Sequence, residues 1–404
     1  MARRTRHPAR RGLITRLFSV LLGTALAAAV MVSMQLPLLD QPASATVALT
    51  RVGSTNSAQL SWPSVGSAAL FVPSLGVTRS WHNAVVPIAS LTKMMTAYVT
   101  LRKLPLSAGQ SGPCVTVSAS DVSTYEYIKA TDQSNAAVSI GENLCEIDLL
   151  NGLLVHSADN YAAMLANMVA GSMTNFVTLM NETARSLGMD STHYADASGF
   201  DSASVSSARD QAHLAALLMQ SALVRAIVLQ PSVTLPVAGT LASYTPFVGT
   251  DNVIGVKSGR TSEAGGCDVM AMTFNQGSTT EVAYAVVLGQ RGGDLLGPAG
   301  DAALALAQSA LRLVHHVTLA KNTMVAHLGW GTHVAPVRLA RDKTLWWWSS
   351  SGSLPLRVHL YHVTDAVRRG EVVGWLHVRG VRSGRVALTA GASVAAPTLW
   401  QRLR

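Results

Sequence analysis

Apolar positions in the first half of the chain predict strands followed by a block of helices. Short Val, Leu and Ala runs between Ser, Pro and Gly residues over 46–80 are typical of strands that open a sheet. From 89 to 104 apolar side chains recur near helical spacing, and Pro105 ends this helix. Further helical patterns follow at 147–155, 161–170, 174–187 and 210–229.

Strand patterns return in the second half, at 253–256, 268–274 and 281–288, followed by an Ala- and Leu-rich helix at 300–315. Because the helices are inserted between early and late strands, this order favours one sheet covered by helices. Beyond about residue 320, short alternating runs between Gly, Ser and Pro turns predict a small all-β domain. We expect its Trp346-Trp347-Trp348 run to be a packed cluster.

The N-terminal segment has the three parts of an export signal. Six Arg residues precede an apolar run over 17–34, which is followed by the small residues Ala43-Ser44-Ala45. We therefore expect the rest of the chain to be exported, with cleavage after Ala45. The apolar run is also long enough for an uncleaved membrane anchor, which is the competing interpretation.

Composition and charge exclude two broad classes. With 49% apolar and 13% charged residues, the chain does not have the composition of a disordered protein. Its net charge of +9 resembles that of a nucleic-acid-binding protein, but the excess lies at the two ends. Residues 331–404 alone carry 11 basic and 3 acidic side chains, which indicates either a solvated surface or attraction to anionic wall polymer or lipid.

Three cysteines allow at most one intramolecular disulfide, and export makes one chemically permissible. Cys114 with Cys145 is the pair that we expect, which leaves Cys267 free. Neither the cysteines nor the adjacent His315 and His316 have metal-ligand spacing, so we predict no metal and no cofactor.

The first chemical candidate is Ser90-Leu91-Thr92-Lys93, at the start of the helix predicted over 89–104. Positions three apart share one face of a helix, so the Lys93 amine can approach the Ser90 hydroxyl and take its proton. An exposed serine and lysine without a catalytic role would have the same spacing in the sequence. The tetrad is therefore weak evidence alone.

Two further elements follow in the order that an acyl-transfer site needs. Ser157, in His156-Ser157-Ala158-Asp159-Asn160, lies between two helical runs, where it is either a proton shuttle or a helix cap. Lys257-Ser258-Gly259-Arg260 directly follows a predicted strand. There a Lys and a hydroxyl can receive a carboxylate, and the glycine allows a close backbone approach, although a solvated strand exit would look similar.

Together the three elements resemble the motif set of penicillin-binding proteins and class A β-lactamases. The sequence around these elements is similar to that of low-molecular-weight D-alanyl-D-alanine carboxypeptidases over roughly 55–310. The segments that carry the similarity are Pro87-Ile-Ala-Ser90-Leu-Thr-Lys93, Leu187-Gly-Met, Ser207-Ala-Arg-Asp210 and Gly255-Val-Lys-Ser-Gly-Arg-Thr-Ser-Glu-Ala-Gly-Gly-Cys267. The resemblance implies an α/β (α+β) catalytic domain over 46–318, with an antiparallel sheet and a helical subdomain. It also implies a β-rich domain over 319–404, after a signal or anchor over 1–45.

The resemblance also implies roles for single residues. Ser90 would be the nucleophile and Lys93 its general base, with Ser157 relaying a proton to the leaving amine. Lys257 and Ser258 would hold the substrate carboxylate, Gly259 would admit the substrate backbone, and the N–H groups of Ser90 and Arg260 would form an oxyanion hole. The partners implied are peptidoglycan stem peptides ending in D-Ala-D-Ala and β-lactam antibiotics, and the location is outside the cytoplasmic membrane or in the wall.

One departure from the family pattern bears on activity. The family places Asn two residues after the shuttle serine, where this chain has Asp159 and then Asn160. A carboxylate there would hold Lys93 protonated, which opposes its role as base. Either the site is tuned differently, or Asn160 supplies the amide, or the activity is weak.

Two other functions compete with a carboxypeptidase. A β-lactamase needs a carboxylate to activate the deacylating water, and Glu182 is the sole Glu between Ser157 and Lys257. A non-catalytic protein that binds wall or penicillin would fit Asp159 and the basic C-terminal region. A penicillin adduct distinguishes the three functions: a durable adduct indicates the carboxypeptidase, rapid turnover the β-lactamase, and no adduct the binding protein.

Overall fold

The computed structural model describes residue 24 and residues 43–53, 59–350, 353–378 and 385–398. The predicted export signal falls outside the described residues, except for its last part, Ala43-Ser44-Ala45. Those three residues lead into and begin strand β1 (Ser44–Val47). Within the described parts of the chain, no single helix has the length and apolar composition of a membrane span.

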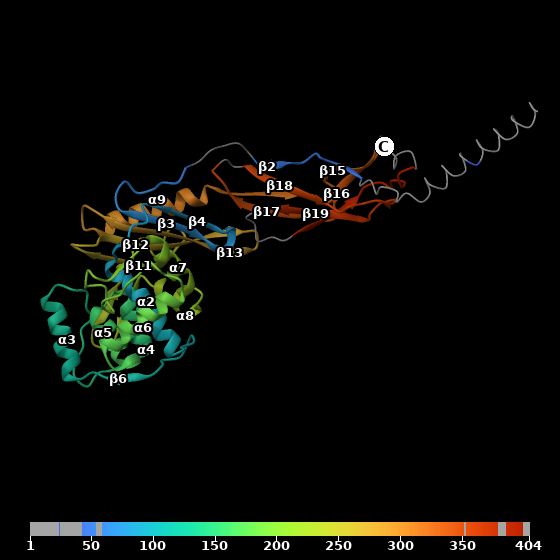
Figure 1. The fold of residues 1–404 in the computed structure, drawn as a ribbon. Helices are drawn as coiled ribbons and strands as arrows, with labels where there is room; N and C mark the ends of the chain where they lie inside the picture. Colours follow the sequence, from blue (N-terminus) through green and yellow to red (C-terminus); the bar gives the residue numbers. More distant parts are fainter. Residues whose placement is uncertain (1–23, 25–42, 54–58, 351–352, 379–384, 399–404) are drawn as a thin grey trace, which may run out of the picture.

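A five-stranded antiparallel sheet lies at the centre of the helical part of the molecule. Its spatial order is β11 (Val253–Thr261), β12 (Gly265–Gln276), β13 (Thr279–Gln290), β3 (Ser67–Val72) and β4 (Val77–Trp81). Figure 1 shows helix α9 (Leu296–Leu311) on one face of this sheet and the other helices on the opposite face. The predicted antiparallel sheet covered by helices is therefore confirmed.

The helices of the opposite face form the largest hydrophobic core. They are α2 (Thr92–Lys103), α3 (Ala119–Ala130), α4 (Glu146–Val155), α5 (Asp159–Ala170), α6 (Met173–Ser186), α7 (Ala208–Leu218) and α8 (Ala222–Val228). There are also short 3₁₀ turns, η1 (Pro73–Leu75) and η2 (Ala89–Leu91), and η2 leads directly into α2. The helical patterns in the sequence agree with these elements, apart from α3, which they did not predict.

Four two-stranded pairs complete this part of the fold: β5 (Val86–Pro87) with β8 (Val205–Ser206), β6 (Cys114–Thr116) with β7 (Asn143–Cys145), β9 (Ser232–Leu235) with β10 (Gly239–Ala242), and β14 (Val314–Leu319) with β17 (Lys343–Trp348). The disulfide expected between Cys114 and Cys145 joins the directly paired positions of β6 and β7. Cys267 is free and buried.

A second sheet, of seven strands, extends to one side of the helical part (Figure 1). Its order is β1, β15 (Met324–Trp330), β16 (His333–Leu339), β20 (Val386–Ala390), β19 (Val372–Val378), β18 (Ser353–Leu360) and β2 (Arg51–Gly53). The expectation that residues from 46 onward open the first sheet is wrong for β1 and β2. Both pair with strands from the C-terminal region, and β3 is the first strand of the five-stranded sheet.

The tryptophan run lies between the two cores. Trp347 is buried in the core of the seven-stranded sheet, whereas Trp346 and Trp348 pack against a cluster that includes Leu70 and Ala310. The Trp348 indole also donates a hydrogen bond to the Ala310 carbonyl (3.1 Å). The expected packed cluster is therefore present. The predicted domain boundary at 318/319 falls within β14, which pairs with β17, and the domain division stays a prediction.

Candidate active site

Ser90 and Lys93 lie where η2 leads into α2, close to the edge strand β11. The Lys93 side chain is fully buried, and its Nζ lies 2.9 Å from Ser90 Oγ. Nζ also donates to the Ser198 carbonyl at 2.8 Å. The backbone before Ser90 is strained, since Ala89 has a φ of 48°. The Ser198 carbonyl and the backbone turn at Ala89 thus keep the Ser90 hydroxyl and the Lys93 amine in contact.

Asp159 is the second partner of Lys93. At the start of α5, its Oδ1 lies 2.5 Å from Lys93 Nζ, and the pair is almost completely buried. Burial raises the pKa of the Asp159 carboxyl above its ordinary value, while the Lys93 ammonium acts in the opposite direction. The carboxylate that departs from the family pattern therefore contacts the amine expected to be the general base.

Ser157 occupies the turn between α4 and α5 in a strained conformation, with a φ of 64°. Its Oγ is buried and has no hydrogen-bond partner among the residues that the structure describes. A buried hydroxyl without a hydrogen-bond partner costs free energy. This favours a Ser157 hydroxyl that forms its hydrogen bond with a bound ligand. The neighbouring His156 ring stacks on Tyr244, with centroids 4.5 Å apart.

Strand β11 carries Lys257, Ser258 and Gly259 along the edge of the sheet. Lys257 is fully buried, and burial, followed by the nearby Lys93 ammonium, lowers its pKa from 10.5 to about 7. Its Nζ donates to the Ser258 carbonyl at 2.7 Å, and Ser258 Oγ donates to the Tyr244 carbonyl at 2.7 Å. A Cβ atom on Gly259 would lie 2.6 Å from the Ser90 nitrogen, so this approach requires glycine.

These segments meet at one cleft of about 450 Å³. From the three motif elements, its lining includes Ser90, Ser157, Ser258, Gly259 and Arg260. Lys93 and Lys257 lie buried beside it, within electrostatic reach of each other and of Asp159. The structure thus brings together residues that are far apart in the sequence, and its geometry suits a nucleophile, a base and a cationic receptor for a carboxylate.

Asn160 is buried and does not line the cleft. Its Oδ1 accepts from the Ala136 N–H at 3.0 Å, and its Nδ2 donates to the Ala136 carbonyl at 2.8 Å. These two bonds hold the loop around residue 136, which lines the cleft with Gln133 and Asn135. The Asn160 amide keeps a second N–H and a second oxygen lone pair beyond these two bonds, so its part in substrate binding stays a prediction and is left out of the function proposed below.

Sequence reasoning missed the loop that supplies the Ser198 carbonyl to Lys93. The Asp196 carboxylate organises this loop, because it accepts from the Ser198 hydroxyl and from the Gly199 N–H. A side chain at Gly199 would collide with the Ala89 carbonyl. The turn-forming letters Asp196-Ala-Ser-Gly199 are the signal that would have directed attention to this loop.

A second missed residue is Asp268, a fully buried carboxyl on β12 directly opposite Ser258. Neither of its oxygens has a hydrogen-bond partner within the described residues. Burial raises its pKa well above 3.8, although Lys257 opposes this shift. No motif singles out this residue, because a lone Asp within a strand pattern is not distinctive.

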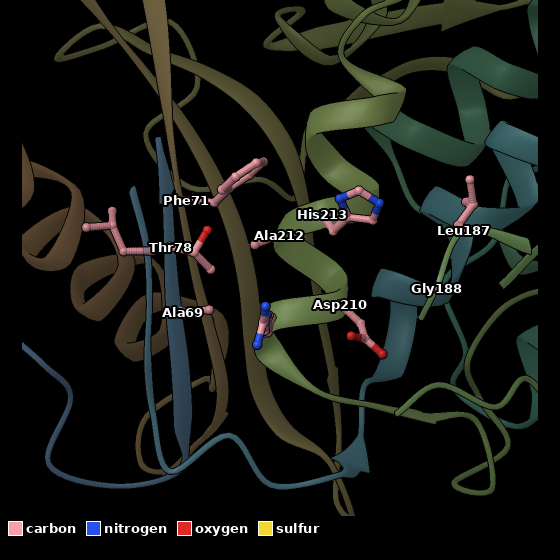
Figure 2. Close-up of a pocket in the computed structure, with 10 residues that line it drawn as sticks. Ala69, Phe71, Thr78, Leu187, Gly188, Asp210, Ala212 and His213 are labelled. Atoms are coloured by element: carbon pink, nitrogen blue, oxygen red, sulfur yellow. The ribbon is translucent and has the colours of Figure 1, made fainter. Parts of the chain in front are cut away.

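Another hollow, of about 270 Å³, lies between strands β3 and β4 and helix α7 (Figure 2). Figure 2 shows Phe71 and Thr78 on the strand side and His213 and Asp210 on the helix side. The Asp210 carboxylate already accepts from the Ser191 N–H and the Thr192 hydroxyl. None of the predicted site residues lines this hollow.

Two other predictions concern groups outside the cleft. Glu182, the carboxylate that a β-lactamase would need, is exposed on α6 and does not line the cleft. Among the described residues, no cluster of three or more His, Cys, Asp or Glu side chains could hold a metal ion.

The sheet, the helical block and the cleft between them are the architecture of penicillin-binding DD-peptidases. Penicillin-binding protein 5 from Haemophilus influenzae superposes with a TM-score of 0.57 over 83% of this chain and 98% of its own, at 21% identity. The Streptomyces K15 DD-transpeptidase gives a TM-score of 0.53 over 62% of this chain and 99% of its own, at 22% identity. These similarities establish the fold.

The chain belongs to the D-alanyl-D-alanine carboxypeptidase family (peptidase family S11), whose family model matches residues 77–292. A D-alanyl-D-alanine endopeptidase from Pseudomonas aeruginosa is 34% identical over 202 residues, which are 48% of this chain and 61% of the relative. The D-alanyl-D-alanine carboxypeptidase DacC from Escherichia coli is 33% identical over 132 residues, 32% of this chain and 33% of the relative. The matches thus span from about a third to about three fifths of the length of these two relatives.

Proposed function

We propose that this protein is a serine-type D-Ala-D-Ala carboxypeptidase, which removes the terminal D-Ala from peptidoglycan stem peptides. The observation that carries the proposal is the 2.9 Å contact between Ser90 Oγ and the buried Lys93 amine, at a cleft that Ser258 lines and beside which Lys257 is buried. A nucleophile with an adjacent base is the minimum that acyl transfer to serine requires. The family membership of the chain supports the same chemistry.

Acylation begins when Ser90 Oγ attacks the carbonyl carbon of the penultimate D-Ala and Lys93 takes the hydroxyl proton. The tetrahedral intermediate then collapses, the peptide C–N bond breaks, and Ser157 passes a proton to the amine of the leaving D-Ala. Ser157 suits this role because its buried hydroxyl has no other partner among the described residues. Water then attacks the ester carbonyl, which releases the shortened peptide and restores Ser90.

Two contacts in the cleft favour this substrate class. Lys257 and Ser258 hold the terminal carboxylate of the peptide, and the closeness of Gly259 to Ser90 lets the substrate lie along β11. The N–H groups of Ser90 and Arg260 stabilise the oxyanion, which is worth about 3–4 kcal/mol per donor in comparable enzymes. Penicillins acylate the same Ser90. The protein acts outside the cytoplasmic membrane or in the wall, where such peptides are found.

The test is release of free D-Ala from a pentapeptide ending in D-Ala-D-Ala, together with labelling by a fluorescent penicillin. Ser90→Ala should abolish both signals while the circular dichroism spectrum stays unchanged. Ser123→Ala, on the exposed face of α3, is the matched control and should retain both. Release of D-Ala by Ser90→Ala would exclude Ser90 as the nucleophile. The absence of any penicillin adduct on the wild type would favour a non-catalytic binding protein.

An endopeptidase that cleaves peptide cross-links is the second candidate. It is favoured by the P. aeruginosa relative, which is named a D-alanyl-D-alanine endopeptidase and is more extensively matched than the E. coli carboxypeptidase. The chemistry at Ser90 is the same, but the leaving amine belongs to a neighbouring stem peptide. Incubation with a purified cross-linked dimer and with the pentapeptide, followed by chromatography, tells which substrate has the larger kcat/KM.

A further inference from the structure

The outer face of the seven-stranded sheet carries a row of cationic and aromatic side chains. Along β18 the alternate positions Leu356 and Val358 pack in the core of this sheet, whereas Arg357 and His359 point the other way and are exposed. On β19 the exposed His377 likewise faces away from the core. These side chains are far from the Ser90 cleft in the fold, and the proposed reaction does not use them.

The strand register brings these side chains into two adjacent rows. Arg357 lies directly opposite His377, and His359 directly opposite Trp375, with ring centroids 4.0 Å apart. The guanidinium of Arg385, the residue before β20, lies 4.7 Å from the centroid of the Trp375 ring. This cation–π contact holds Arg385 over the sheet, so its charge is positioned before any ligand arrives.

Together the two rows line a hollow of about 540 Å³, within the size range of small-molecule sites. The remaining lining residues are Val47 and Thr50, from the N-terminal segment, and Leu356 and Val358. A hollow of this shape admits a projecting group of a ligand.

The charge around the hollow is of one sign. No acidic side chain lines it, and Arg357 and Arg385 make no ion pair with any described residue. The acidic residues after 330 have partners of their own: Asp342 accepts from the Lys321 N–H, Glu371 accepts from the Arg368 N–H, and Asp365 is also engaged. The guanidinium groups are therefore available for an anionic ligand.

We propose that this hollow binds an acidic polysaccharide, whose carboxylate or phosphate groups contact Arg357, Arg385 and His377 while a sugar ring packs against His359 and Tyr361. Guanidinium groups recognise carboxylates and phosphates through paired hydrogen bonds, and exposed rings offer apolar area to the C–H faces of a sugar. Tyr361 is 46% exposed and lies 5.4 Å from Trp375, centroid to centroid, at the edge of the aromatic group. The site would tether the protein to an anionic polymer independently of Ser90.

The test measures binding of the purified protein to fluorescein-labelled polygalacturonate, phosphorylated dextran and neutral dextran, and to phosphatidylglycerol vesicles. We expect binding to one or both acidic polymers, weakened by salt, with no binding to neutral dextran. The double variant Arg357→Gln/Arg385→Gln should bind at least about tenfold more weakly, because two charge-assisted contacts are lost. Arg341→Gln/Arg368→Gln removes the same charge from exposed positions outside the hollow and should bind like the wild type.

Equal losses in both double variants would overturn the proposal, because they would show a nonspecific charge effect. Binding to vesicles alone, or equal binding to neutral dextran, would also overturn it. Penicillin labelling at Ser90 should be the same in the two double variants and the wild type. The binding result can therefore fail or succeed without any bearing on the proposed catalytic function.

Discussion

Lys93 and Asp159 form a buried ion pair, with Nζ and Oδ1 2.5 Å apart, directly beside the Ser90 hydroxyl. The same amine is the only nitrogen base within hydrogen-bond reach of Ser90 Oγ in the contacts of the described residues. The pair therefore places a carboxylate on the group that we propose accepts the Ser90 proton. A carboxylate stabilises a positive charge beside it, whereas the proposed acylation needs a neutral amine, so these two requirements oppose each other in this pair.

Replacing Asp159 with Asn tests how the carboxylate affects the rate of acylation. The amide keeps the size of the side chain and removes the anion beside the proposed base, so acylation by penicillin should be equal or faster. The second-order rate constant of acylation, measured by stopped flow with a fluorescent penicillin, is the readout. A fall of more than about tenfold would mean that the carboxylate has a positive role, for instance in orienting Lys93.

The activity should depend on pH through Lys257. Burial lowers the pKa of its ammonium to about 7, so the fraction that can hold a carboxylate falls as pH rises above that value. We expect kcat/KM for a peptide with a free terminal carboxylate to decrease above about pH 7. kcat/KM is the relevant constant because it reports on the free enzyme.

A peptide amide, which lacks the terminal carboxylate, is the matched substrate for this pH experiment. Its kcat/KM should be lower throughout and should lack the decline that begins near neutrality. If both substrates decline together, the titrating group is not the carboxylate receptor.

A methyl group on Gly259 should block the cleft from the strand side. Its Cβ would lie 2.6 Å from the Ser90 nitrogen and 3.1 Å from the Ser90 Cα, so β11 and η2 would have to separate. Because the Ser90 N–H is one of the proposed oxyanion donors, Gly259→Ala should lower the acylation rate by about 100-fold or more. A normal melting temperature would assign the loss to the site, and an acylation rate near that of the wild type would refute the predicted close approach.

Glu146 should make the fold more stable in acid than at neutral pH. The side chain is fully buried at the start of α4, neither carboxyl oxygen has a hydrogen-bond partner among the described residues, and burial raises its pKa from 4.5 to about 7. Between these values the folded state holds the proton more tightly than the unfolded state. The free energy of unfolding therefore falls as pH rises through this window.

Glu146→Gln should remove that dependence. At pH 8 the variant should be more stable than the wild type by about 2–3 kcal/mol, and at pH 4 the two should be similar. Urea denaturation at both pH values measures the difference. Glu126→Gln, at an exposed position on α3, is the control that should change neither value. A variant that is less stable at pH 8 would contradict the account.

Periodicity predicted the elements whose burial follows a regular pattern. The strand pattern over 268–274 lies within β12, and the pattern from 89 to 104 covers η2 and α2. Helix α3 was missed because only Tyr125 and Ile128 on it are buried, so it has little apolar periodicity. Its Ser118–Asp121 capping box was the available signal.

Pairing between distant segments could not be predicted from local pattern. The residues of β1 and β2 are compatible with strands. Their local sequence does not specify that the strands that pair with them lie some 280 to 300 residues later. The site shows the same limit. Side chains such as Ser90, Lys93 and Lys257 can be recognised by type and order, whereas the Ser198 contact uses a backbone carbonyl, which every residue has.

The pairing of β1 and β2 with the seven-stranded sheet has a mechanical consequence. The chain runs from β2 to the five-stranded sheet, completes it, and returns through β14, so two covalent connections join the sheets. A rotation of one sheet against the other must therefore bend both connections at once. A single proteolytic cut in either connection would leave the two sheets joined covalently through the other, so the Ser90 cleft and the outer sheet would stay attached where modules joined by one connection would separate.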